Sequence, residues 1–319
     1  MTTGLFSSRS GRWLRLGILW VALAALALLC VRIVVYLAGR PPALDPILQA
    51  PGLATLVLLS YLLSHGFRAL RITLIVGDFR IGLREMTAFH FVTAACSIAL
   101  PFKLGELLRI SELPRMIRGS LIRAVVIVWV ERLFDVAVFV LLLFVAALSA
   151  DAVGSNVTAV MLLSCVFIFL SLIALFLLPD NLRRAAVYII RRYRTRSTVP
   201  VLRAIDGTRS AIAEAPAMLR GKVSSLCVLT LLVWALELMS FSLALRMVGS
   251  PGDAVSSLLS FISSITSGNT LAGMLSRGST DLTTYLTLTQ IPLVALGALA
   301  GVYHLARGRR AAVVTAGSL

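Results

Sequence analysis

Histidine and cysteine are too few and too scattered in this sequence to form a metal site. The chain has three histidines, and its cysteines Cys30, Cys96, Cys165 and Cys227 each lie in a different apolar segment. No group of them has the spacing of metal ligands, so buried and unreactive thiols are the better interpretation. A P-loop or other nucleotide-binding motif is also missing. We therefore expect no metal ion and no cofactor.

Acidic residues are scarce as well. The chain has 14 Asp and Glu against 30 Lys and Arg, an excess that would suggest a nucleic-acid partner in a soluble protein. However, 59% of the residues are hydrophobic and the mean hydropathy is +0.95. This is more apolar surface than one soluble core can bury, so we predict an integral membrane protein that does not bind nucleic acid.

Long apolar runs make up most of the chain. A helix needs about 20 residues to cross about 30 Å of hydrocarbon, and six runs are long enough: residues 13–37, 53–76, 122–149, 157–178, 223–248 and 282–306. We predict an all-α protein with a single polytopic membrane domain over residues 1–319. Each half, 1–150 and 151–319, contains one further apolar stretch that is interrupted.

The distribution of basic residues predicts the orientation, because cytoplasmic loops of membrane proteins collect Lys and Arg. These residues gather at the N-terminus (Arg9, Arg12, Arg15), in the turn after the second run (Arg68, Arg71, Arg80, Arg84), in segment 180–222 and in residues 307–310. We therefore place both termini and segment 180–222 in the cytoplasm, and the protein in the plasma (inner) membrane.

Charges and two prolines interrupt the first of the broken stretches, in ALPFKLGELLRISELP at residues 99–114. A complete crossing at 86–100 would leave the basic residues that follow in the only strongly basic outer loop. A hairpin over residues 86–114 that enters from the cytoplasm, breaks at Pro101 and returns keeps them inside. We therefore predict a re-entrant hairpin.

The second broken stretch predicts a hairpin from the opposite face. Residues 254–278 lie on the outer side by the same count, and Ser-Gly-Asn-Thr at 267–270 ends any helix there. Two hairpins of opposite sense are typical of an inverted repeat with a central site. Because irregular backbone at membrane depth must be buried in protein or line a wet cavity, we expect a cavity between them.

Four charged residues lie deep in the predicted spans. Glu131 is about 13 Å from the start of its run at a rise of about 1.5 Å per residue, and Asp135 lies one turn further on the same face. Arg132 can pair with Asp135, and Glu237 is similarly deep in its own span. Charges at this depth must face protein, water or substrate. A helix-locking role and a substrate role both remain open.

Lys103, Glu106 and Arg109 are the further candidate substrate-binding residues. Glu106 and Arg109 are three residues apart and share one turn. A carboxylate beside an arginine can bind a zwitterionic or phosphate head group, with Arg109 as the phosphate ligand. The alternative is an ion pair that only stabilises the hairpin, and Lys103 can instead extend to the cytoplasmic surface.

Basic clusters alternate with apolar and tyrosyl positions at residues 181–197. This pattern fits a helix that lies on the inner leaflet and is attracted to anionic lipid by about 1 kcal/mol per basic residue. The general enrichment of basic residues in cytoplasmic loops would produce much of the same pattern.

Two segments together resemble the transmembrane region of the lysylphosphatidylglycerol synthase family, also called the flippase-like family. The segments are FHFVTAACSIALPFKLGELLRISEL and SLIRAVVIVWVERLFDVAVFVLLLF, and the residues that match the family pattern are Pro101, Lys103, Gly105, Glu106, Arg109, Glu131, Arg132 and Asp135. The second hairpin differs from the family pattern, because it has no carboxylate before Asp281.

The resemblance implies a protein that moves a lipid with a polar head group between leaflets, such as an aminoacyl phospholipid, a glycolipid or a polyprenyl-phosphate lipid. The soluble aminoacyl-transfer domain of the full synthase is absent from this sequence, so we expect no enzyme activity and no catalytic residue. Two alternatives remain: an accessory subunit that docks a glycosyltransferase or lipid-modifying enzyme on its basic face, and a small-solute transporter.

Overall fold

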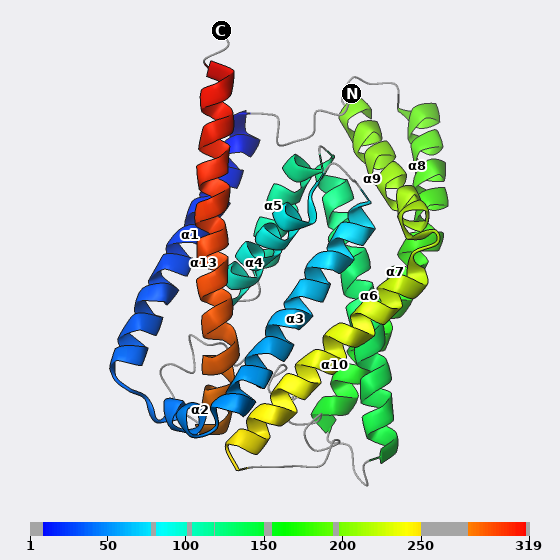
Figure 1. Ribbon diagram of the computed structural model, residues 1–319. Coiled ribbons are helices and arrows are strands. Elements are labelled where there is room, and N and C mark those ends of the chain that lie inside the picture. The colour runs from blue at the N-terminus through cyan, green and yellow to red at the C-terminus, as the bar shows by residue number, and fades with distance from the viewer. Residues whose placement is uncertain are drawn as a thin grey trace. The chain divides into compact units, whose positions relative to one another are not determined.

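The computed structural model describes residues 9–77, 81–100, 104–117, 119–149, 155–193, 198–249 and 280–316. They form α-helices and one short 3-10 helix, with no strand among them, so the all-α prediction is confirmed. Figure 1 labels these helices along the chain. Contacts divide the chain into two compact units. Unit 1 comprises Met1–Gly11, Arg71–Asp78 and Ile110–Thr230, and unit 2 comprises Arg12–Leu70, Phe79–Arg109 and Leu231–Leu319. The single membrane domain over 1–319 stays a prediction.

Unit 2 is built around long apolar helices. It contains nearly all of α1 (Arg9–Ala38), most of α3 (Pro51–Val76), α4 (Leu83–Ala99), the later part of α10 (Val223–Met247) and α13 (Thr280–Ala316). The short helices η1 (Pro42–Leu44) and α2 (Asp45–Gln49) pack against α13.

The core of unit 2 follows helical periodicity. On α1 it is formed by Ala22, Leu26, Leu29 and Ile33, which recur every three or four residues and so share one face. They belong to one buried cluster with residues of α3, α4, α10 and α13. The helices therefore pack through one apolar face each, and much of the surface outside these faces is apolar as well.

Helix α13 packs closely along α4 because two small residues line its contact face. A Cβ atom on Gly297 would lie closer than 3 Å to the Phe91 carbonyl oxygen and to the Ala95 side chain, whereas one on Gly301 would meet only Val92, at 3.9 Å. Two small residues four positions apart let membrane helices approach each other at backbone distance. This packing fixes the position of α4, which leads into the predicted hairpin.

The helix break that the prolines predict lies after α4. Leu100 adopts an extended conformation, with φ −100° and ψ 140°, as expected of a residue that precedes a proline. Helix α5 (Gly105–Met116) then begins with Gly105 against Ser97, where no Cβ atom would fit. The chain therefore turns back on itself within a few residues, while re-entry into a membrane stays a prediction.

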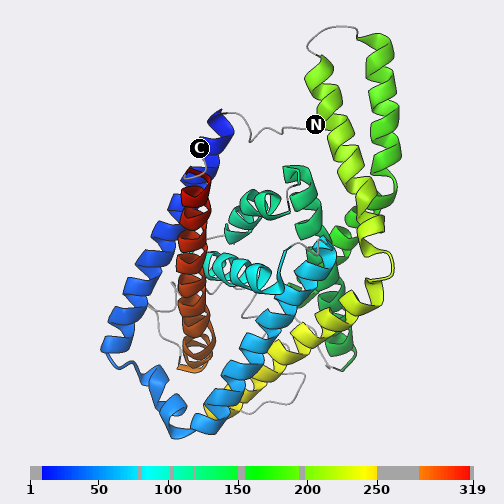
Figure 2. The same cartoon turned by 45° about the horizontal axis from the view of Figure 1, so that its top comes forward.

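Unit 1 contains α6 (Leu121–Ser149), α7 (Ser155–Phe176), α8 (Leu178–Arg192) and α9 (Thr198–Leu219), with the end of α3 and the start of α10. Helix α6 packs against α7 and α9, and the Trp129 indole donates a 2.9 Å hydrogen bond to Ser171 on α7. Helices α8 and α9 lie side by side as a helical hairpin (Figure 2).

Five of the described helices are long and apolar enough to cross a bilayer: Leu16–Ala38, Pro51–Val76, Val157–Phe176, Val223–Met247 and Leu282–Tyr303. They match five of the six predicted runs, so the chain is a multi-pass membrane protein. The sixth run is α6, which is 29 residues long. Its first half is not uniformly apolar, because it carries Arg123, Glu131, Arg132 and Asp135.

Replacing Gly297 with alanine should separate α4 from α13, because the new methyl group would collide with backbone and side-chain atoms of α4. We expect a loss of about 1–3 kcal/mol, typical of overpacking, measured as a lower unfolding temperature of the detergent-solubilised protein. Gly301→Ala is the matched control and should leave that temperature nearly unchanged. Equal effects of the two substitutions would contradict the proposed close contact.

Candidate functional site

A buried charge cluster in unit 1 centres on Arg71, near the end of α3. Its Nη1 donates to Asp135 Oδ1 at 2.6 Å and its Nη2 donates to Asp135 Oδ2 at 3.0 Å. Nη2 also donates to Glu131 Oε1, and Nη1 to Thr230 Oγ1 on α10, both at 3.0 Å. Arg71 is 0% exposed. One guanidinium thus connects the ends of α3 and α10 with the middle of α6.

The cluster is balanced in charge and close to ideal in geometry. Arg71 and Asp135 form a two-pronged guanidinium–carboxylate pair, which is the strongest ordinary side-chain contact of this kind. Arg132 adds the predicted i, i+3 pair, with Nη1 donating to Asp135 Oδ2 at 3.0 Å, but its side chain is 36% exposed. Two cations face two carboxylates, and Arg71 is the cation at the centre.

Unit 2 contains a second ion pair, between α3 and α10. Arg68 Nη2 donates to Glu237 Oε1 at 2.6 Å, and the Ser64 hydroxyl donates to the same oxygen at 3.3 Å. A second contact joins these helices, since Ser240 donates to the carbonyl of Val57 at 3.0 Å. Glu237 therefore satisfies its charge inside the protein.

Two buried histidines connect α3 with α4 beside this pair. His65 Nδ1 lies 3.1 Å from His90 Nε2, and Tyr61 packs edge-on against the His65 ring with centroids 4.8 Å apart. Such a hydrogen bond needs one ring nitrogen as donor and the other as acceptor. His65 and Arg68, the latter placed by the sequence analysis in the turn after the second run, both make interior contacts.

Glu106 and Arg109 lie one turn apart on α5, as their spacing predicts. Their charged groups are 3.9 Å apart, which is an ion-pair distance and too long for a hydrogen bond. Arg109 is only 3% exposed, and the Glu106 side chain is 26% exposed. This pair is therefore looser than the cluster around Arg71, although it is nearly as well buried on the cationic side.

The profile of the family described as "Lysylphosphatidylglycerol synthase TM region" matches residues 46–308 of the chain. The chain belongs to this family. No curated protein matches it in sequence, and no solved structure matches it either. The match covers every candidate residue of this lysylphosphatidylglycerol synthase TM-region protein, including those on α3, α5, α6 and α10.

Some of the predicted site residues of this family member fall outside the part of the chain that the structure describes. Lys103 and the second hairpin at residues 254–278 lie outside the described residues. Glu131, Arg132 and Asp135 come together in unit 1, whereas Glu106 pairs with Arg109, and Glu237 with Arg68, in unit 2. Among the described residues no group of three His, Cys, Asp or Glu side chains is arranged to hold a metal ion.

The sequence analysis did not identify Arg68 and Arg71 as the partners of the buried carboxylates. Both were counted as charges of the turn after the second run, but both lie inside α3, which continues to Val76. Their spacing was the available signal: His65, Arg68 and Arg71 recur every three residues inside an apolar helix. Three deep carboxylates on other spans also required cations from somewhere.

Replacing Arg71 with methionine should strongly destabilise this family member. Removing one partner of a buried ion pair typically costs about 3–5 kcal/mol, because the remaining charges stay buried and uncompensated. Thermal unfolding in detergent measures the loss. Arg132→Met serves as the control, since this half-exposed arginine contacts the same Asp135, and it should cost much less. A similar loss for both variants would show that burial does not set the strength of these contacts.

Proposed function

We propose that the protein moves a lipid with a polar head group between the leaflets of the plasma (inner) membrane. Membership of the family and the multi-pass helical architecture support this proposal. The single observation that carries it is Arg109, a nearly fully buried arginine whose guanidinium lies 3.9 Å from the carboxylate of Glu106 on the short helix after the break. A guanidinium that is removed from solvent and lies beside a carboxylate is suited to bind a phosphate or zwitterionic head group.

The two kinds of buried arginine suggest different roles. Both terminal nitrogens of Arg71 already donate two hydrogen bonds each, so a substrate would have to displace strong contacts to reach it. We infer that Glu131, Arg132 and Asp135 lock helices together around Arg71. Arg109 and Glu106 would bind the head group, with the guanidinium on a phosphate and the carboxylate on an ammonium or hydroxyl group.

The substrate class that fits this pair is an aminoacyl phospholipid, a glycolipid or a polyprenyl-phosphate lipid. Movement would be downhill or coupled to protons, and Glu106, Glu131 and Glu237 are the candidate proton carriers within the helices. We place both termini and segment 180–222 in the cytoplasm, where the segment would contact anionic lipid. The protein would bind and move its lipid without a catalytic step.

The proposal predicts lipid translocation by the purified protein in liposomes. Arg109→Gln should slow the initial rate about tenfold or more, since a hydrogen bond between an arginine and a phosphate contributes about 1.5–3 kcal/mol. Labelled aminoacyl phospholipids, glycolipids and polyprenyl-phosphate lipids would be tested for accessibility to a membrane-impermeant reagent.

Arg115→Gln provides a matched control on the same helix. Arg115 also pairs with a glutamate three residues away, Glu112, but 62% of its side chain is exposed. It should leave the translocation rate unchanged. If the wild-type protein accelerated none of the lipids across this panel, the proposal would fail.

A second candidate function is that of an accessory subunit, favoured by one observation on α8. This helix has no buried residue, and its last turn carries Arg191 and Arg192 beside the exposed Tyr188 and Ile190. A basic surface with exposed apolar side chains can dock a glycosyltransferase or another lipid-modifying enzyme.

The two functions predict opposite mutational patterns. For an accessory subunit, exchanging Arg191 and Arg192 for glutamine should abolish co-purification of the partner enzyme and the cellular activity, while Glu106→Gln changes neither. For a lipid transporter, Glu106→Gln should lower the transport rate in liposomes that contain no other protein. Quantitative pull-down and the liposome assay on the same variants separate the two.

A further inference from the structure

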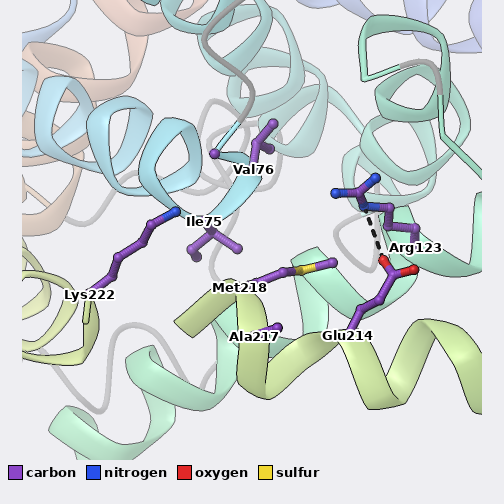
Figure 3. Close-up of a pocket in the computed structure, with 8 residues that line it drawn as sticks. Ile75, Val76, Arg123, Glu214, Ala217, Met218 and Lys222 are labelled. Atoms are coloured by element: carbon purple, nitrogen blue, oxygen red, sulfur yellow. Dashed lines mark ion pairs between the residues drawn. The ribbon is translucent and has the colours of Figure 1, made fainter. Parts of the chain in front are cut away.

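An open pocket of about 440 Å³ lies in unit 1, where the ends of several helices meet. The last residues of α3, including Ile75 and Val76, form one wall, and α9 contributes Glu214 and Met218. Arg123 of α6 and Lys222, just before α10, extend toward the end of α3 from opposite sides (Figure 3). Its volume is within the range of small-molecule sites.

Lys222 has a structural role on one side of the pocket. Its Nζ donates a 2.8 Å hydrogen bond to the Leu74 carbonyl, which is one of the last carbonyls of α3 and lacks a helical partner. Gly77 follows with φ +63° and ends the helix. Of the three protons on this ammonium group, one is used by α3 and two are available to a ligand.

Arg123 is the residue that this local structure does not explain. Its nearest charged partner is Glu214, with Nε 3.6 Å from Oε2, too far for a hydrogen bond. Within the described part of the chain, its guanidinium makes no hydrogen bond, and the buried Nε is among the polar atoms without a partner. A planar group with five donors is thus directed into a pocket and held there only by a distant carboxylate.

We propose that this pocket binds the phosphate of a phospholipid head group through Arg123, assisted by Lys222. Phosphate oxygens match the fork of a guanidinium, and an ammonium group adds a second positive charge. Met218 and Val76 supply an apolar wall for the glycerol and the first acyl carbons. Glu214 would compete with the phosphate for Arg123. The pocket uses none of the residues in the proposed translocation site, so each proposal can fail without the other.

A head group and free phosphate present the same chemistry, and the experiment separates them. Native mass spectrometry of the full-length protein in detergent would count bound phosphatidylglycerol, and a diacylglycerol glucoside with the same acyl chains but no phosphate. Inorganic phosphate would be added as competitor. We expect wild-type protein to prefer phosphatidylglycerol, and inorganic phosphate at millimolar concentration to displace little of it.

Two substitutions should change binding in opposite directions. Arg123→Gln should weaken retention of phosphatidylglycerol about tenfold, as expected for the loss of a charged hydrogen bond to phosphate. Glu214→Gln should strengthen it, because it removes the carboxylate that competes for Arg123. If Arg123 and Glu214 contributed only to the stability of the fold, both substitutions would change lipid retention in the same direction. Arg123→Lys, which keeps the charge without the fork, should lie between the wild type and Arg123→Gln.

Arg209→Gln is the matched control. Its side chain is 39% exposed, as is that of Arg123, and it pairs with Asp206 on α9 outside the pocket. It should leave lipid retention unchanged. If inorganic phosphate displaced phosphatidylglycerol from the wild type but not from Arg123→Gln, free phosphate would be the ligand. The pocket would then still be a phosphate site. Equal retention of both lipids, or no effect of Arg123→Gln, would overturn the proposal.

Discussion

Every charge inside the apolar helices has to be neutralised within the protein, and this constraint shapes the described structure. An isolated charge at the centre of a membrane helix costs at least about 2.5 kcal/mol even on the most lenient scale. Around Arg71 of α3, helices α6 and α10 supply two carboxylates and a hydroxyl group within 3.0 Å. A shift in register between the helices of unit 1 would break these contacts.

The same constraint applies to unit 2. Glu237 needs a cation, and Arg68 provides it at 2.6 Å together with the hydroxyl group of Ser64. Close packing of α13 on α4 adds to this charge pairing, since Gly297 permits an approach that no larger residue would allow. Charge pairing specifies which helices meet, and small residues determine how closely they approach.

Local patterns in the sequence predict the local features of this structure. The apolar runs match five spanning helices, Pro101 predicts the break that follows α4, and the spacing of Arg132 and Asp135 predicts their pair. Each of these depends on residues that are close together in the chain. The family resemblance on residues of α5 and α6 is confirmed over residues 46–308.

Contacts between distant residues were not predictable in the same way. Glu131 and Asp135 are 60 and 64 residues from Arg71, and Glu237 is 169 residues from Arg68. Spacing rules for one helix carry no information on which helix lies opposite. Positive charges near a span end were therefore read as topology signals. The spacing of Gly297 and Gly301 matches a small-residue motif for helix packing, but the motif does not identify the partner helix.

The contacts of Arg71 are those of an arginine that holds helices together. Arg71 is fully buried and each of its terminal nitrogens donates two hydrogen bonds, so it contributes rigidity and has little left to offer a ligand. The charged groups of Arg109 and Glu106 are 3.9 Å apart, and Arg123 faces a pocket with the Glu214 carboxylate 3.6 Å away. A site that has to release its ligand cannot bind it as tightly as Asp135 binds Arg71, because such a site would retain the ligand.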